Sequence, residues 1–90
     1  MLIALIARDK PGALQTRMDN REAHLAYIKE TGVVSQAGPL LDDAESMIGS
    51  LIVLEVANLD AARDWAANDP YAKAGLFDSV ELIPWKKVIG

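Results

Sequence analysis

The sequence predicts an α+β domain whose elements follow the order strand, helix, strand, strand, helix, strand. Two runs, residues 2–7 and 51–54, are apolar at every position, which is typical of strands buried on both faces. Two other segments carry apolar residues at helical spacing, and turn residues separate the segments. This order is the split βαβ, or ferredoxin-like, pattern with a four-stranded antiparallel sheet.

The first strand is followed by a strong turn and then by a helix. The run 2–7 ends at the turn cluster 9–12 (Asp-Lys-Pro-Gly), which is typical of a loop. From Ala13 to Glu30 we expect a helix of about five turns that ends at Gly32. Its apolar residues recur every three or four positions when Arg21 is counted with them, and so form one helical face: Leu14, Met18, Leu25 and Ile28.

Two strands and an acidic turn are expected next. The second strand runs from Val33 to Leu41, and Pro39 removes a backbone donor there, which indicates an edge position or a bulge. Residues 42–46 form an acidic connection that reads as a solvated turn, because their spacing does not fit a calcium loop. The third strand runs from Met47 to Val56.

The second helix and the last strand complete the pattern. Asn58 is a suitable N-cap for a helix that carries Leu59, Ala62, Trp65 and Ala66 on one side. Asp69-Pro70 interrupts that helix and starts another short turn, which Gly75 would end. The last strand is expected from Phe77 to Ile89, with Pro84 again indicating an edge or a bulge.

The length of the chain predicts one domain, residues 1–90, and an additional partner. Two helices cover only one face of a four-stranded sheet, yet two strands are apolar on both faces. No segment remains to cover the second face. We therefore expect a homodimer that packs sheet against sheet, while assembly beyond a dimer stays open.

Composition excludes several function classes. Nine Lys and Arg against thirteen Asp and Glu give a net charge of −4, which argues against nonspecific nucleic-acid binding. The absence of Cys excludes disulfides and thiolate nucleophiles, and a single His excludes a site of several imidazoles in one chain. We expect no metal and no cofactor. The apolar N-terminal run is too short for a signal peptide or a membrane span, so we expect a cytoplasmic protein without a membrane partner.

His24 is the first candidate for chemistry, because His is the residue type whose ordinary pKa lies near neutrality. Arg17, Arg21 and His24 follow one another at spacings of four and three, so they line one side of the predicted helix. Two guanidinium groups beside an imidazole would hold an anionic group. The alternative is a partly exposed helix His beside two solvated arginines.

Asp69 and Ser50 are further candidates. Asp69 precedes Pro70, as an N-cap residue does, and it could also orient the imidazole of His24. Both roles are compatible if each carboxylate oxygen takes one partner. Ser50 opens the third strand and could donate to a substrate oxygen or satisfy the strand end, but no G-x-S-x-G setting makes it a nucleophile.

Several strings along nearly the whole chain resemble the YciI-like family, the YCII-related domain. They are Arg17-x-x-x-Arg21-x-x-His24-Leu25, Ala37-Gly38-Pro39, Gly49-Ser50, Asp69-Pro70-Tyr71 and Pro84-Trp85-Lys86-Lys87-Val88. The resemblance implies a ferredoxin-like fold of the dimeric α+β barrel type and an active site centred on a His–Asp pair, here His24 and Asp69. It places Arg21, Gly38 and Ser50 near that pocket. The connection after Leu41 looks shorter than the family's loop, and Trp85 replaces a more usual Phe.

Two hypotheses of function follow, both with a small-molecule ligand. In the first, the protein is an enzyme that needs no cofactor: His24 accepts and returns a proton, Asp69 fixes its tautomer, and Arg21 with Arg17 steers an anionic oxygen. The family resemblance implies elimination, dehalogenation or isomerisation of a small hydroxylated aromatic or lactone. In the second, a dimeric module binds or carries a small ligand without turnover. A purely structural dimer is a third possibility and predicts no pocket.

Overall fold

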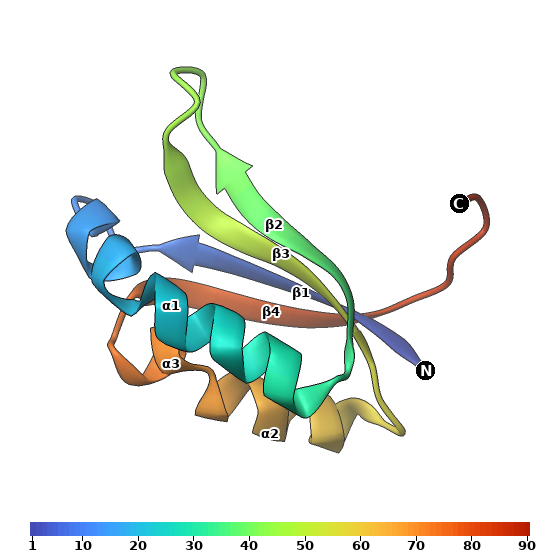
Figure 1. Ribbon diagram of the computed structural model, residues 1–90. Helices are drawn as coiled ribbons and strands as arrows, with labels where there is room; N and C mark the ends of the chain where they lie inside the picture. Colours follow the sequence, from blue (N-terminus) through green and yellow to red (C-terminus); the bar gives the residue numbers. More distant parts are fainter.

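The computed structural model describes residues 1–90 and confirms the predicted α+β, ferredoxin-like architecture (Figure 1). All neighbouring strands are antiparallel, and the sheet order is β2-β3-β1-β4. The helices lie on one face of this sheet. The elements are β1 (Leu2–Asp9), α1 (Leu14–Thr31), β2 (Val34–Leu41), β3 (Met47–Glu55), α2 (Leu59–Asn68), α3 (Pro70–Lys73) and β4 (Phe77–Trp85).

Both strands that contain proline lie at the edges of the sheet, as predicted. Pro39 is in β2 and Pro84 is in β4, and each of these strands pairs on one side only. The prediction that β4 continues to Ile89 is wrong, because the strand ends at Trp85. Trp85 pairs with Leu2, the first residue of β1, so the ladder between the two strands ends there.

The two faces of the central strand β1 differ in burial. Ile3, Leu5 and Ala7 point toward the helices and are buried in a core with Ile52, Leu54, Ala62 and Trp65. Leu2, Ala4 and Ile6, which alternate with them, are only half-buried, because no element of the chain covers the other face. The sheet therefore has one covered face and one open apolar face, as the two-sided apolar strands predict.

The local signals at helix ends and turns are confirmed. Gly32, with a φ of 65°, caps α1, a left-handed conformation that favours glycine. Asn58 accepts a hydrogen bond from the Ala61 N–H at 2.9 Å and begins α2. The connection 42–46 is exposed, and Asp42 Oδ1 accepts from the N–H groups of Ala44 and Ser46. No helix is long and apolar enough to cross a bilayer.

The predicted apolar face of α1 is buried only in part: Ile28 packs against the core, whereas the other three residues of that face are about half exposed. Leu14, Met18 and Leu25 are 47%, 49% and 45% exposed, whereas Arg17 and His24 are 3% and 6% exposed. Arg17 and His24 lie seven positions apart, so they share a stripe beside the apolar one. This stripe faces inward because partners for both polar groups lie on β1, β3 and the segment between α2 and α3.

Candidate functional site

A cavity of about 200 Å³ lies between α1 and the strands β2 and β3. Its size suits one six-membered ring with small substituents, since a cavity of roughly 150 Å³ holds a benzene molecule. The cavity brings together five of the six site residues that the sequence analysis singled out; the sixth, Asp69, contacts His24 from behind it. It is lined by Arg17, Arg21, His24, Leu25, Ile28, Ala37, Gly38, Pro39, Met47, Ser50, Ile52 and Tyr71.

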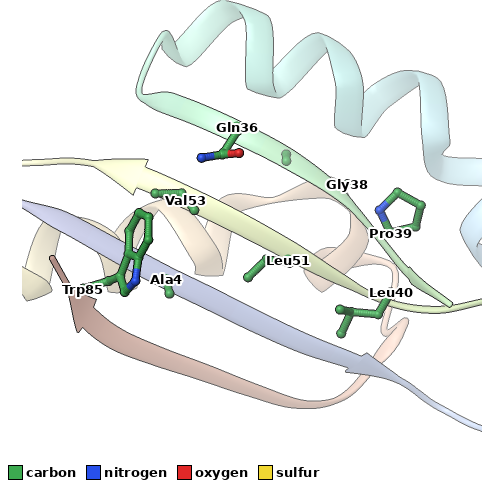
Figure 2. Close-up of a pocket in the computed structure, with 9 residues that line it drawn as sticks. Ala4, Gln36, Gly38, Pro39, Leu40, Leu51, Val53 and Trp85 are labelled. Atoms are coloured by element: carbon green, nitrogen blue, oxygen red, sulfur yellow. The ribbon is translucent and has the colours of Figure 1, made fainter. Parts of the chain in front are cut away.

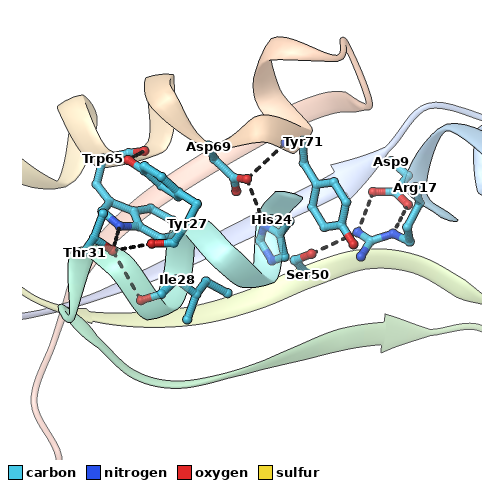
Figure 3. A network of polar contacts seen from close by, with 10 residues as sticks. All are labelled: Asp9, Arg17, His24, Tyr27, Ile28, Thr31, Ser50, Trp65, Asp69 and Tyr71. Atoms are coloured by element: carbon cyan, nitrogen blue, oxygen red, sulfur yellow. Dashed lines mark hydrogen bonds and ion pairs between the residues drawn. The ribbon is translucent and has the colours of Figure 1, made fainter. Parts of the chain in front are cut away.

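His24 and Asp69 form a direct, buried contact although they are 45 positions apart (Figure 3). The distance from His24 Nδ1 to Asp69 Oδ1 is 2.7 Å, and the two side chains are 8% and 1% exposed. A carboxylate only accepts hydrogen bonds, so Nδ1 carries a hydrogen, and in the neutral imidazole Nε2 is the nitrogen with the lone pair. The imidazole thus has one nitrogen held by the protein and one left for a ligand.

Asp69 also caps α3, but it does so in a way the sequence analysis did not expect. Its Oδ1 accepts from the Tyr71 N–H at 3.0 Å as well as from His24, so one oxygen takes both partners. The other oxygen, Oδ2, is buried without a hydrogen bond. That oxygen has therefore lost its hydration without gaining a hydrogen bond in exchange.

Tyr71 connects the two halves of the site. Its ring is stacked on the His24 imidazole, with centroids 3.9 Å apart at 15°, and the Arg17 Cζ lies 4.7 Å from its centroid. Figure 3 shows the phenol ring between the imidazole and the guanidinium. Burial raises the pKa of Tyr71, and this outweighs the lowering effect of Arg17 and Arg21. The phenol is therefore neutral at ordinary pH and fixes the plane of the imidazole.

Arg17 belongs to a second polar group, next to the first. Its Nε and Nη2 donate to the Asp9 carboxylate at 2.7 and 2.9 Å, and Nη2 also donates to Ser50 Oγ at 2.9 Å. The side chains of Arg17 and Asp9 are 4% and 5% exposed. Burial acts to lower the pKa of Arg17, but the hydrogen bonds and charge of Asp9 outweigh it and raise the pKa above its ordinary value. Arg17 stays cationic and paired.

The remaining candidates lie at the edge of the cavity. Arg21 is exposed and lines the cavity, so it is the cationic group there that stays in contact with solvent. Gly38 lies in the edge strand β2 and lines the cavity with its neighbours. Gly49, beside Ser50, is required sterically, because a Cβ there would collide with the Ala7 carbonyl of β1.

Two residues that make contacts in the candidate site, Asp9 and Tyr71, were not singled out from the sequence. Asp9 was interpreted only as part of a turn, and Tyr71 appeared only within a family string. The alternative of a solvated His beside two solvated arginines is excluded for His24 and Arg17 by their burial, and it describes Arg21 alone. No pattern in the sequence pairs Asp9 with Arg17, since acidic residues next to a Pro-Gly turn are common.

The site combines a base and hydrogen-bond donors. His24 Nε2 can accept a proton, while Arg21 and Ser50 offer donors to an oxygen atom. The structure contains no group of three or more His, Cys, Asp or Glu side chains arranged to hold a metal ion. The arrangement is suited to proton transfer on a small ligand with polar oxygens.

A second hollow lies on the open face of the sheet (Figure 2). It measures about 530 Å³ and shares Ala37, Gly38 and Pro39 with the first cavity. Strand β2 therefore separates the two. The hollow is mostly apolar, and Trp85, Leu51 and Val53 lie along it.

Comparison with known proteins identifies relatives along the whole chain. The model of the YCII-related domain matches residues 1–86. An uncharacterised protein of Haemophilus influenzae is 38% identical, covering 98% of this chain and 99% of that protein. The protein YciI of Escherichia coli is 37% identical with the same coverage.

Solved structures agree with this comparison. The 5-chloro-2-hydroxyhydroquinone dehydrochlorinase of Burkholderia phenoliruptrix, in complex with 2,5-dihydroxybenzoquinone, is 37% identical. Its TM-score is 0.87, with 96% of this chain and 94% of that chain covered. An antibiotic biosynthesis monooxygenase is 11% identical with a TM-score of 0.58, covering 97% of this chain and 100% of that one, and shares the fold alone.

Proposed function

This chain belongs to the family of YCII-related domains, and from that premise we propose that it is an enzyme of small-molecule acid–base chemistry. His24 is the general base and acid, and Asp69 holds its tautomer. The observation that carries the proposal is the 2.7 Å contact between His24 Nδ1 and Asp69 Oδ1 beside a cavity that His24 lines. General acid–base catalysis of this kind contributes about 10²–10⁴-fold in rate.

The substrate class we propose is a single ring that bears hydroxyl or carbonyl oxygens and a leaving group such as chloride. The cavity has room for one ring, and the 37% identical dehydrochlorinase supports this class. In the elimination, His24 Nε2 takes a proton from the substrate and chloride leaves with the electron pair of its bond. The product has lost HCl, and no oxidant is required. Isomerisation of a lactone would use the same base to remove and return a proton.

The test is turnover by the purified protein and its His24→Gln variant. Turnover of chlorinated hydroquinones is measured as release of chloride, and isomerisation of lactones is measured by NMR. We expect turnover by the wild type and a loss of about 10²–10⁴-fold in His24→Gln. The matched control is Arg63→Gln, because Arg63 pairs only with Asp60 on the exposed surface of α2. Equal rates in His24→Gln and wild type would contradict the mechanism. Equal ligand binding without product would favour a non-catalytic binding module.

We also propose that two copies pack through the open sheet face, as the two-sided apolar strands predicted. Leu51, Ile83 and Trp85 are 41%, 44% and 42% exposed on that face. Register places them beside the half-buried residues of β1. An apolar face of this kind is typical of a permanent interface.

Light scattering during size-exclusion chromatography tests the dimer. We expect a dimer for the wild type and a monomer for Leu51→Lys. Met18→Lys is the matched control, because Met18 is 49% exposed but lies on α1 at the helix side of the sheet. A wild-type monomer at high concentration would contradict the proposal.

A further inference from the structure

Ser50 has a hydroxyl group whose hydrogen has no acceptor in the chain. The residue is 3% exposed, and its Oγ receives the hydrogen bond from Arg17 Nη2. A guanidinium only donates, so Ser50 is the acceptor in this contact and its own hydrogen is directed elsewhere. The hydroxyl makes no other hydrogen bond in the structure, and Ser50 lines the cavity. An oxygen atom of a ligand in the cavity would accept the hydrogen bond that the Ser50 hydroxyl has left to donate.

Asp9 determines where this donor points, although it does not line the cavity itself. Its carboxylate accepts hydrogen bonds from both Nε and Nη2 of Arg17. This planar, bidentate contact fixes the guanidinium in one orientation. In that orientation the second hydrogen of Nη2 reaches Ser50. Asp9 also cancels the charge of Arg17 next to the Tyr71 and His24 stack, so the site does not accumulate positive charge.

From this geometry we infer that Asp9 is a positioning residue which acts through Arg17 to turn the Ser50 hydroxyl hydrogen into the cavity, toward an anionic or carbonyl oxygen of the ligand. Arg17 is a positioning residue in the same chain of contacts, and Ser50 touches the ligand. The inference rests on the proposed function of the cavity and deepens it. It requires one oxygen of the ligand to lie beside Ser50, while His24 exchanges a proton with another atom of the ligand.

The test uses nitrocatechol, a hydroxylated aromatic probe whose ionised form absorbs visible light. Binding and the pH at which the bound probe ionises are measured for wild type, Ser50→Ala, Asp9→Asn and the double variant. A donor to the ionised oxygen favours ionisation, so we expect the bound probe to ionise at lower pH in the wild type than in Ser50→Ala. We expect about tenfold weaker binding in Ser50→Ala, the scale of a hydrogen bond to a charged group.

The double variant separates positioning from a merely structural role. If Asp9 acts through Ser50, adding Asp9→Asn to Ser50→Ala weakens binding by no more than about twofold. Losses that multiply in the double variant would overturn the inference, as would an unchanged ionisation of the probe in Ser50→Ala. Ser50→Ala leaves the Asp9–Arg17 pair intact, so this arm stands even where Asp9→Asn does not fold.

The same variants distinguish this inference from the proposed function. Turnover that depends on His24 but keeps the wild-type KM in Ser50→Ala and Asp9→Asn would overturn the inference and leave the proposed function standing. Probe binding that depends on Ser50 and Asp9, in a protein whose His24→Gln variant loses no activity, would overturn the acid–base mechanism and support the inference.

Discussion

Helix α1 carries a polar stripe that is buried and, beside it, an apolar stripe that is largely exposed. The stripe of Leu14, Met18 and Leu25 is about half exposed, whereas Arg17 and His24 are buried. The buried stripe is the one whose polar atoms find partners on other elements: Asp9 and Ser50 for Arg17, and Asp69 for His24. On the inward side of this helix the polar groups of Arg17 and His24 are satisfied by partners, and Tyr27 and Ile28 add apolar contacts with the core.

The largest expected effect on stability comes from breaking the buried ion pair. Arg17→Ala leaves the carboxylate of Asp9 buried and unpaired, and we expect the free energy of unfolding to fall by about 3–5 kcal/mol. The matched control is Arg63→Ala, whose pair with Asp60 is 61% and 89% exposed and should contribute at most about 1 kcal/mol. Urea unfolding measures both. Similar losses in the two variants would show that burial of the polar stripe is not the source of its stability.

The second prediction concerns the partner of His24. Asp69→Asn keeps one oxygen that can cap α3, but it replaces the other carboxylate oxygen with an NH2 donor and removes the negative charge beside the imidazole. We expect the rate constant kcat to fall by about 10²–10⁴-fold while α3 remains formed. Turnover with the substrate found for the wild type measures the first effect, and circular dichroism checks the second. Wild-type kcat in Asp69→Asn would contradict the tautomer role of Asp69.

A smaller effect on the free energy of unfolding is expected at alkaline pH from Tyr71, whose ring is stacked on His24. In the unfolded chain Tyr71 loses its proton at about pH 10, whereas burial raises its pKa in the folded protein. Above about pH 10 the unfolded state therefore binds fewer protons than the folded state. The contribution of Tyr71 to the free energy of unfolding is complete below that pH and is lost as pH rises through the raised pKa.

The Tyr71→Phe variant isolates this contribution. We expect its urea midpoint to fall less between about pH 8 and pH 11 than that of the wild type. Some loss should remain, because burial and the charges of Asp69 and Asp64 also raise the pKa of Tyr27. Tyr27 and Tyr71 are the two tyrosines of the chain, so phenolate absorbance separates them. The same midpoint shift in Tyr71→Phe and wild type would contradict the prediction.

The smallest effect is expected in the exposed apolar stripe. Met18→Gln should change the free energy of unfolding by no more than about 0.5 kcal/mol, because the Met18 side chain is 49% exposed. Leu5→Ala, in the core, should cost about 2–5 kcal/mol by comparison. Urea unfolding tests both. A loss in Met18→Gln near that of Leu5→Ala would reveal burial of this stripe in the assembled protein.

The parts of the fold that sequence reasoning reached depend on neighbouring residues. The helix cap at Asn58, the end of α1 at Gly32 and the edge positions of Pro39 and Pro84 each follow from backbone donors and φ angles of a few consecutive residues. The end of β4 was missed because the length of a strand depends on its partner, and the ladder with β1 ends at the pair Leu2 and Trp85.

In the candidate site, too, the features set by neighbouring residues were predicted, and spacing alone did not predict the contacts between distant residues. His24 was proposed for its chemistry, and Asp69 for its position before Pro70 and the family string. Their contact joins residues 45 positions apart, and no spacing rule predicts it. Both hydrogen bonds of Asp69 fall on Oδ1, contrary to expectation, because the Tyr71 N–H at the start of α3 and the imidazole approach the same side of the carboxylate.

The order of the elements, the edge strands and the second apolar sheet face follow from the amino-acid sequence, because they depend on sterics and alternation among consecutive residues. The inward side of α1, the pairing of Asp9 with Arg17 and the hydrogen that Ser50 has left to donate depend on how distant elements pack together. The reason is physical: burial of a charge is favourable only where partners stand within hydrogen-bond distance, and that distance is set by how separate elements pack.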